Sequence, residues 1–180
     1  FCVPRKNLVE AFAGTAKNKD FVLYGEGMGK TFVENIDRAT RLTRIYDVVT
    51  IMFDWPTYRP FLSGGKNYRL SMNQSKQVAR PFSKLFSEIE KIKTEGKLGP
   101  GKLSMILHSL GNRLIKQAVL NNNIEVKTKL FDNIILNAAC VKMRGHKKWL
   151  EKLNIQDQIY VTRNNRDRTL NLARIAGLSK

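Results

Sequence analysis

The hydrophobic positions of this chain form short continuous runs that alternate with segments of helical periodicity. Runs of this kind, without polar alternation, are typical of strands that are buried on both faces of a sheet. They occupy residues 21–24, 48–53, 103–107, 131–136 and 159–162. Between them, apolar residues recur every three or four positions, which predicts helices. The predicted helices cover residues 5–13, 32–45, 72–93, 114–120 and 169–178.

Strands that are separated by helices predict βαβ units. We therefore expect an α/β fold, a three-layer sandwich whose mainly parallel sheet carries helices on both faces. Residues 57–70 are expected to form a loop, because they contain Pro60 and paired glycines and follow Pro56. Pro81 is expected to kink the long helix or to mark its true start. Without a repeat or a long linker, residues 1–180 are expected to form a single domain.

The charge of the chain is strongly basic, with 32 Lys and Arg against 15 Asp and Glu and a formal net charge of +17. This excess fits an anionic partner, such as nucleic acid, phospholipid head groups or an acidic substrate, or simply a soluble basic surface. Arg38, Arg41 and Arg44 recur at helical spacing, but aromatic residues are not interleaved with the cations as on base-stacking surfaces. No apolar run is long enough to predict a transmembrane helix.

The strand ending at Leu107 leads into a helix through the sequence HSLG. A serine on such a sharp turn exposes its hydroxyl above the carboxyl edge of the sheet, as in a nucleophile elbow. The backbone N–H of Leu110 would face an oxyanion at the start of that helix. In the pattern G-x-S-x-G around Ser109, Leu107 takes the place of the first glycine. His108 is expected to point away from the serine hydroxyl and to serve as a packed or hydrogen-bonding support.

Three motifs follow strand ends in a fixed order: GMGKTF at 27–32, FDWP at 53–56 and HSLGN at 108–112. With these motifs the chain resembles the α/β-hydrolase superfamily, in particular a little-characterised bacterial branch. The resemblance covers about residues 20–175. It implies an α/β-hydrolase fold in which Ser109 is the nucleophile and the Met28 N–H is the second oxyanion donor.

The resemblance also marks where this chain departs from the family pattern. Family members often carry His-Gly where this chain has Glu26 and Gly27, so an acidic side chain lies near a site for negative charge. The acid position of the family matches Asp167, which could equally cap the helix that follows it. The family would place the catalytic histidine beyond Asp167, but no histidine follows. Either the sequence stops short of a C-terminal strand and histidine loop, or the base has been lost.

His146 is the other histidine of the chain, and it precedes Asp167 in a basic stretch. We expect His146 to lie at the surface beside these lysines. His146 could still line the site together with Gly27, Glu26 and Trp55, since it follows a strand end.

The glycine-rich segment 25–31 (GEGMGKT) offers an alternative, because it follows a strand and opens a helix like a phosphate-binding loop. Asp54 could then hold Mg²⁺. The spacing G-x-x-x-x-G-K-[ST] fails by one residue, because Tyr24 stands where the first glycine is required. Nucleotide binding is therefore the weakest of the interpretations.

The sequence thus favours a serine hydrolase that cleaves an ester or another acyl compound, with Ser109 as nucleophile and Asp167 as the acid. Trp55, Tyr58 and Phe61 could form part of an apolar substrate wall. The alternative is a non-catalytic α/β-hydrolase-like binding module with a basic surface for an anionic partner. No metal or cofactor is expected. The compartment and the oligomeric state stay open, with the bacterial cytoplasm slightly favoured over the envelope or secretion.

Overall fold

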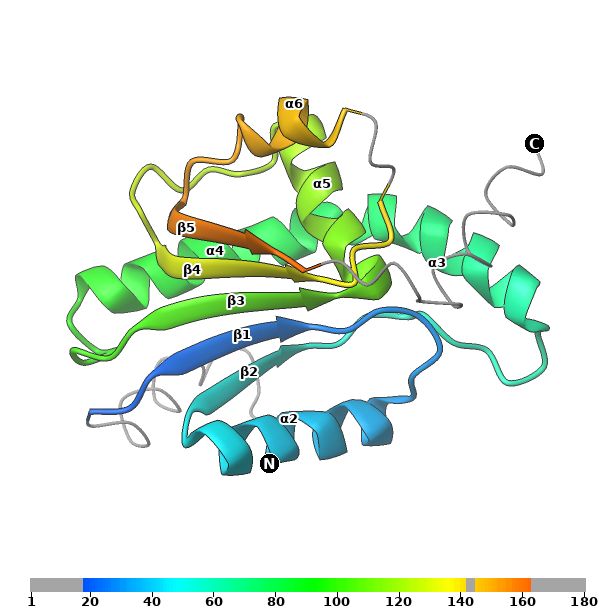
Figure 1. The fold of residues 1–180 in the computed structure, drawn as a ribbon, viewed down its shortest axis with the longest axis horizontal. Coiled ribbons are helices and arrows are strands. Elements are labelled where there is room, and N and C mark those ends of the chain that lie inside the picture. Colours follow the sequence, from blue (N-terminus) through cyan, green and yellow to red (C-terminus); the bar gives the residue numbers. More distant parts are fainter. Residues whose placement is uncertain (1–17, 142–144, 163–180) are drawn as a thin grey trace.

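The computed structural model describes residues 18–141 and 145–162, which form one sheet flanked by helices (Figure 1). Every neighbouring pair of strands is parallel, and the order across the sheet is β2-β1-β3-β4-β5. The α/β class and the parallel sheet predicted from the hydrophobic pattern are therefore confirmed. The strands are β1 (Phe21–Gly25), β2 (Val49–Phe53), β3 (Leu103–His108), β4 (Phe131–Asn137) and β5 (Gln156–Val161).

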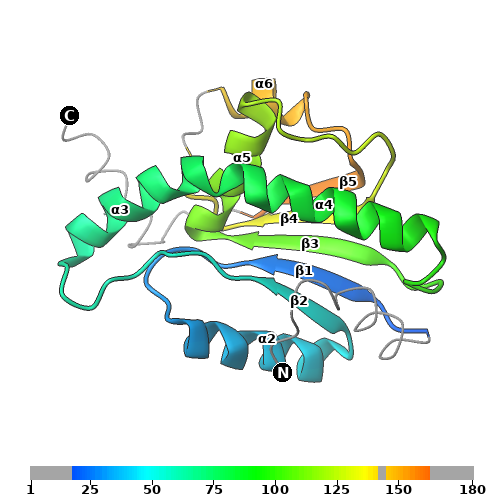
Figure 2. The same ribbon diagram turned by 180° about the vertical axis from the view of Figure 1, so that it is seen from behind.

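The strand order decides which face each helix covers. The chain moves from β1 outward to β2, then crosses back over β1 to β3 and continues to β4 and β5. Because connections between parallel strands are right-handed, this reversal places the first helix on one face and the later helices on the other. Figure 2 shows α4 running alongside the strands on its face of the sheet. The helices are α2 (Phe32–Tyr46), α3 (Gly64–Gln77), α4 (Ala79–Thr94), α5 (Asn112–Leu120) and α6 (His146–Leu150).

The larger of two hydrophobic clusters lies between the sheet and the helices α4 and α5. An aromatic chain runs through it, with centroid distances of 4.8 Å for Phe53–Phe82, 4.8 Å for Phe82–Phe86 and 5.4 Å for Phe86–Phe131, all edge to face. Edge-to-face contacts of this kind add to the stabilisation from burial. The smaller cluster joins β1 to α2 on the opposite face.

The segment expected as the loop 57–70 is helical from Gly64 onward, and this prediction was wrong for its second half. Asn67 explains the difference, because its amide exchanges hydrogen bonds with the backbone of Arg59 (2.8 and 3.0 Å) and also donates to Leu62 O (3.0 Å). These tertiary bonds hold the start of α3 where the local composition favours a loop. The single helix expected over 72–93 is two helices that meet at Val78, shortly before Pro81.

The remaining differences concern polar or short segments. β5 begins at Gln156 rather than at residue 159. The Gln156 side chain is buried but accepts from Ile155 N and donates to Leu153 O, and the next two polar residues are exposed. The sequence pattern did not indicate α6. The helices predicted over 5–13 and 169–178 lie outside the described residues. No helix within the described ranges combines the length and the apolar character needed to cross a membrane.

The aromatic chain leads to a stability prediction. Phe86 is fully buried and contacts the rings on both sides, so Phe86→Ala should lower the free energy of unfolding by about 3–5 kcal/mol. Urea denaturation measures this value. Lys84→Ala, at an exposed position of the same helix, is the control and should change it by less than about 0.5 kcal/mol. Equal losses for the two variants would contradict this account of the core.

Candidate active site

Ser109 lies on the sharp turn between β3 and α5. A single 3-10 turn, Ser109–Gly111, connects the strand to the helix, and Ser109 has a φ of 50°. A residue other than glycine rarely adopts this left-handed backbone conformation, which costs about 1–3 kcal/mol and persists only where neighbouring contacts hold it. The turn therefore depends on contacts that hold Ser109 in place.

Asn112 supplies most of those contacts. Its side-chain amide donates to the carbonyl oxygens of Leu107 (3.0 Å), Ser109 (2.9 Å) and Asn137 (3.1 Å). The backbone N–H of Cys140 donates to the same Ser109 oxygen at 3.1 Å. The ends of β3 and β4 and the start of α5 are thus joined around one residue. The sequence motif contained Asn112, but its role as a brace was not predicted.

The loop after β1 packs directly against this turn. A Cβ atom on Gly27 would lie 2.8 Å from Ser109 Cβ and 3.1 Å from Leu110 N. A Cβ on Gly111 would lie 2.5 Å from the Gly25 carbonyl oxygen. Both glycines are therefore required by close approach. The segments that carry the two predicted oxyanion donors, Met28 and Leu110, come together at the carboxyl edge of the sheet.

This contact falls between β1 and β3, where the direction of the chain across the sheet reverses. The loop after β1 leads to α2 on one face, and the turn after β3 leads to α5 on the other. In open α/β sheets the crevice at such a switch point is the usual place for a ligand.

Leu107, which replaces a small residue of the elbow pattern, is fully buried. Its partner on the neighbouring strand is Gly25, where a Cβ would lie 2.7 Å from Leu107 Cδ2. The leucine side chain thus occupies the space that a side chain at residue 25 would need. The departure from the pattern is accommodated by the next strand without distorting the turn.

Glu26 carries a buried carboxylate that connects several elements, with only 2% of the residue exposed. It accepts from Gly27 N (2.8 Å) and Tyr24 OH (3.1 Å), lies 3.0 Å from Arg38 Nε and is 2.5 Å from His108 Nδ1. His108 thus makes a hydrogen bond behind the turn, and Arg38 of α2 is part of the same cluster.

The electrostatics of Glu26 follow from these partners. Burial alone would raise its pKa, but the hydrogen bonds from His108 and Gly27 and the charges of His108 and Arg38 outweigh burial and lower the pKa to about 2. The carboxylate is therefore ionised and compensated. Its negative charge is directed at Arg38 and at the hydrogen bonds with His108 and Gly27, and away from the expected oxyanion position.

Trp55 is 4% exposed and donates its indole N–H to the Glu26 carbonyl at 2.8 Å. Trp55 and Glu26 therefore support the loop after β1 from inside the protein, and the expectation that Trp55 forms part of a substrate wall stays a prediction. The other two proposed wall residues differ, since Tyr58 is 37% exposed and Phe61 is 81% exposed.

His146 begins α6, and its ring lies 5.0 Å from that of Trp149. Burial, together with the charge of Lys116, lowers its pKa. α6 contacts α5 and lies beside it at the end away from the turn (Figure 1). Asp167, the predicted acid, lies outside the described residues.

A second polar cluster borders the turn that contains Ser109. Tyr68 of α3 places its hydroxyl 3.8 Å from Cys140 Sγ, and burial first, then the neighbouring Cys140, raises the Tyr68 pKa to about 12. Burial lowers the pKa of Arg113, which lies on the first turn of α5. The sequence contained no signal for this cluster, because its members come from three distant segments.

The Gly-Lys-Thr segment is used in a different way from a phosphate-binding loop. Thr31 is the N-cap of α2 and forms a capping box with Glu34, whose carboxylate also accepts from Lys30 Nζ at 3.3 Å. Asp54 accepts a hydrogen bond from Asn35 at 2.6 Å. The residues that would bind phosphate and Mg²⁺ are thus engaged in starting and fixing a helix.

Two shallow hollows among the described residues lie elsewhere, along α4 and beside the end of α5, and neither includes Ser109 or Met28. The described residues contain no group of three or more His, Cys, Asp or Glu that could hold a metal ion.

Comparison with protein families gives one match of nearly full length. A family model described as an alpha/beta hydrolase of unknown function (DUF900) matches residues 5–179. Neither the curated proteins nor the solved structures contain a match.

The pKa of Glu26 leads to a prediction for acid stability. Because the folded pKa of about 2 is below the unfolded value, the carboxylate stabilises the fold above about pH 4.5 and loses this contribution as the pH falls toward 2. Between about pH 6 and pH 3, the wild type should therefore lose about 2 kcal/mol more unfolding free energy than Glu26→Gln. Urea titrations at both pH values measure the difference. Parallel losses in the two proteins would show that Glu26 is not held as described.

Gly27 leads to a second prediction. An added Cβ must displace Ser109 or the backbone of Leu110, so Gly27→Ala should destabilise the protein by about 1–3 kcal/mol. Gly65→Ala is the matched control, because a Cβ there meets nothing within 4 Å and the residue lies in a helix. The control should leave the melting temperature unchanged or raise it slightly. A melting temperature for Gly27→Ala equal to that of Gly65→Ala would disprove the close contact.

Proposed function

Since this chain belongs to the α/β-hydrolase family just described, we propose that it is a serine hydrolase of ester or other acyl substrates, with Ser109 as the nucleophile. The observation that carries this proposal is the backbone of Ser109, held at a φ of 50° between a parallel strand and a helix. A nucleophile elbow presents its serine in this way, above the carboxyl edge of the sheet.

The proposed chemistry follows from the two loops that meet at Ser109. Its hydroxyl oxygen would attack the acyl carbonyl, and the developing oxyanion would accept from the N–H groups of Leu110 and Met28. Both segments are fixed before any substrate arrives: Asn112 holds the turn, and Glu26 holds the loop through His108 and Gly27. Such preorganised donors lower the barrier because they need no rearrangement during the reaction.

Proton transfer is the remaining requirement, since a neutral serine hydroxyl is a poor nucleophile. His108 is engaged through Nδ1 with Glu26, and His146 has its contacts at α6. Asp167 remains the proposed acid that would orient a histidine, as the family resemblance implies. Glu26 and His108 are proposed as positioning residues only.

Activity-based labelling tests this proposal. A fluorophosphonate probe should label the full-length protein, and Ser109→Ala should abolish the labelling because the probe bonds covalently to an activated serine. Ser63→Ala is the matched control, since Ser63 is exposed and its side chain makes no capping bond. The control should be labelled like the wild type.

The labelling experiment also separates the alternative function. A correctly folded full-length protein that is never labelled would overturn the hydrolase proposal and favour a non-catalytic binding module of the same fold. Labelling that survives in Ser109→Ala would assign the nucleophile to another residue.

A further inference from the structure

The segment from Trp55 to Ser87 is basic throughout. It contains no Asp or Glu, and its cations are Arg59, Lys66, Arg69, Lys76, Arg80 and Lys84. All six residues are exposed, and within the described residues no ion pair involves their side chains. This differs from the C-terminal half of α4, where Glu88 and Glu90 are interspersed with the lysines.

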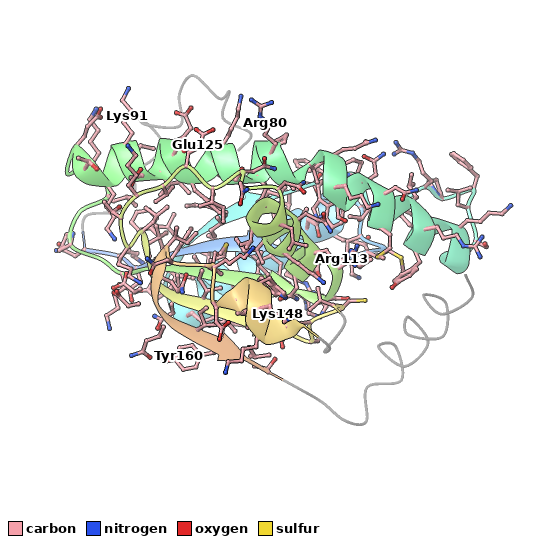
Figure 3. All side chains as sticks on the ribbon, turned by 90° about the horizontal axis from the view of Figure 1, so that it is seen from above. Arg80, Lys91, Arg113, Glu125, Lys148 and Tyr160 are labelled. Atoms are coloured by element: carbon pink, nitrogen blue, oxygen red, sulfur yellow. The ribbon has the colours of Figure 1, made fainter. Side chains whose placement is uncertain are left out.

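The cations of α3 and of the start of α4 lie at helical spacing within each helix. Lys66, Arg69 and Lys76 of α3 are three and seven positions apart, and Arg80 and Lys84 of α4 are four apart. The opposite face of α3 is buried through Asn67, Ser71 and Ser75. In Figure 3 the side chains of Arg80 and Lys91 extend from the outer side of α4, away from the sheet. We call the six cations Arg59, Lys66, Arg69, Lys76, Arg80 and Lys84 the basic stripe.

An exposed aromatic turn adjoins the stripe. Phe61 is 81% exposed, and Tyr58 nearby is 37% exposed. The turn is nevertheless well ordered, because Leu62 N donates to Arg59 O at 3.1 Å and the Asn67 amide bonds both carbonyls. Ser71 Oγ adds a bond to Thr57 O at 2.9 Å. The hydrogen-bonded turn therefore keeps the Phe61 ring exposed to solvent, whereas a flexible loop would allow the ring to pack against the protein surface.

The position of these features suggests what they contact. α3 extends beyond the carboxyl ends of the strands, at the end of the molecule where Ser109 lies (Figure 1). Apolar side chains next to unpaired cations form the combination that enters the interface of an anionic bilayer.

We propose that the basic stripe and the turn 58–62 dock this protein onto an anionic phospholipid surface. The cations would lie against the phosphate groups of the lipids, and Phe61 would enter the boundary between head groups and acyl chains. A lipid surface fits better than a nucleic acid, because the exposed aromatic rings stand at one end of the stripe and are not interleaved with its cations. The proposal does not depend on Ser109 being a nucleophile.

Co-sedimentation of the full chain with vesicles tests the proposal. Binding is expected with vesicles of equal parts phosphatidylcholine and phosphatidylglycerol but not with phosphatidylcholine alone, and it should weaken as sodium chloride is added. The double variant Lys66→Glu/Arg69→Glu should weaken binding by about tenfold or more, because each cation at an anionic surface contributes several-fold to affinity. Phe61→Ser should weaken it as well, with circular dichroism unchanged.

The matched control is Lys127→Glu/Lys152→Glu. It changes the net charge by the same amount, but both lysines are exposed in segments that lead into the amino ends of β4 and β5. The control should bind vesicles like the wild type. Three results would overturn the proposal: no binding to anionic vesicles by the folded wild type, equal losses in the two double variants, or a Phe61→Ser variant that binds normally while a duplex oligonucleotide binds more tightly than vesicles. The last result would indicate a nucleic-acid surface.

Discussion

The candidate site depends on the close approach of two backbones at the carboxyl edge of the sheet. The loop after β1 and the turn after β3 touch without any intervening side chain, because residues 27 and 111 have none. The topology makes this possible, since the two segments leave adjacent strands and continue to opposite faces. Two rows of backbone N–H groups can then converge on one point. A site that relies on backbone donors needs this geometry more than it needs any particular side chain.

Electrostatics reinforce the same contact. Glu26 belongs to the loop, His108 to the strand before the turn and Arg38 to α2, so one carboxylate joins three elements. The indole of Trp55 joins the same residue to the segment after β2. A buried ion pair is often weak evidence for stability, because desolvation offsets much of the attraction. Here the carboxylate links the loop directly to the strand that precedes Ser109.

The hydrophobic pattern was sufficient for the sheet, because each strand keeps an apolar run even where partly buried polar residues such as Ser104, Asp132 and Asn133 lie within it. It failed where tertiary contacts override local composition, as in α3, whose glycine-rich start is fixed by Asn67. It also failed at the edge strand β5, which begins with the polar residues Gln156, Asp157 and Gln158.

Ser109 could be proposed from its place between a strand and a helix. The contact between Glu26 and His108 could not be predicted from the sequence. The two residues are 82 positions apart, and the register of β1 against β3 brings them together. The same holds for Asn112, which the motif contained but whose carbonyl partners include Asn137 on the next strand.

The Leu107 side chain occupies the space that a side chain at position 25 of the adjacent strand would need, so the residue type at one position limits the residue type at the other. Proteins in which a large residue precedes the serine by two positions are expected to carry glycine at the end of the neighbouring strand. A motif search that examines only the residues around the serine rejects such chains. A search that scores the two strand ends together would retain them, and it would enlarge the set of sequences in which this turn can be recognised.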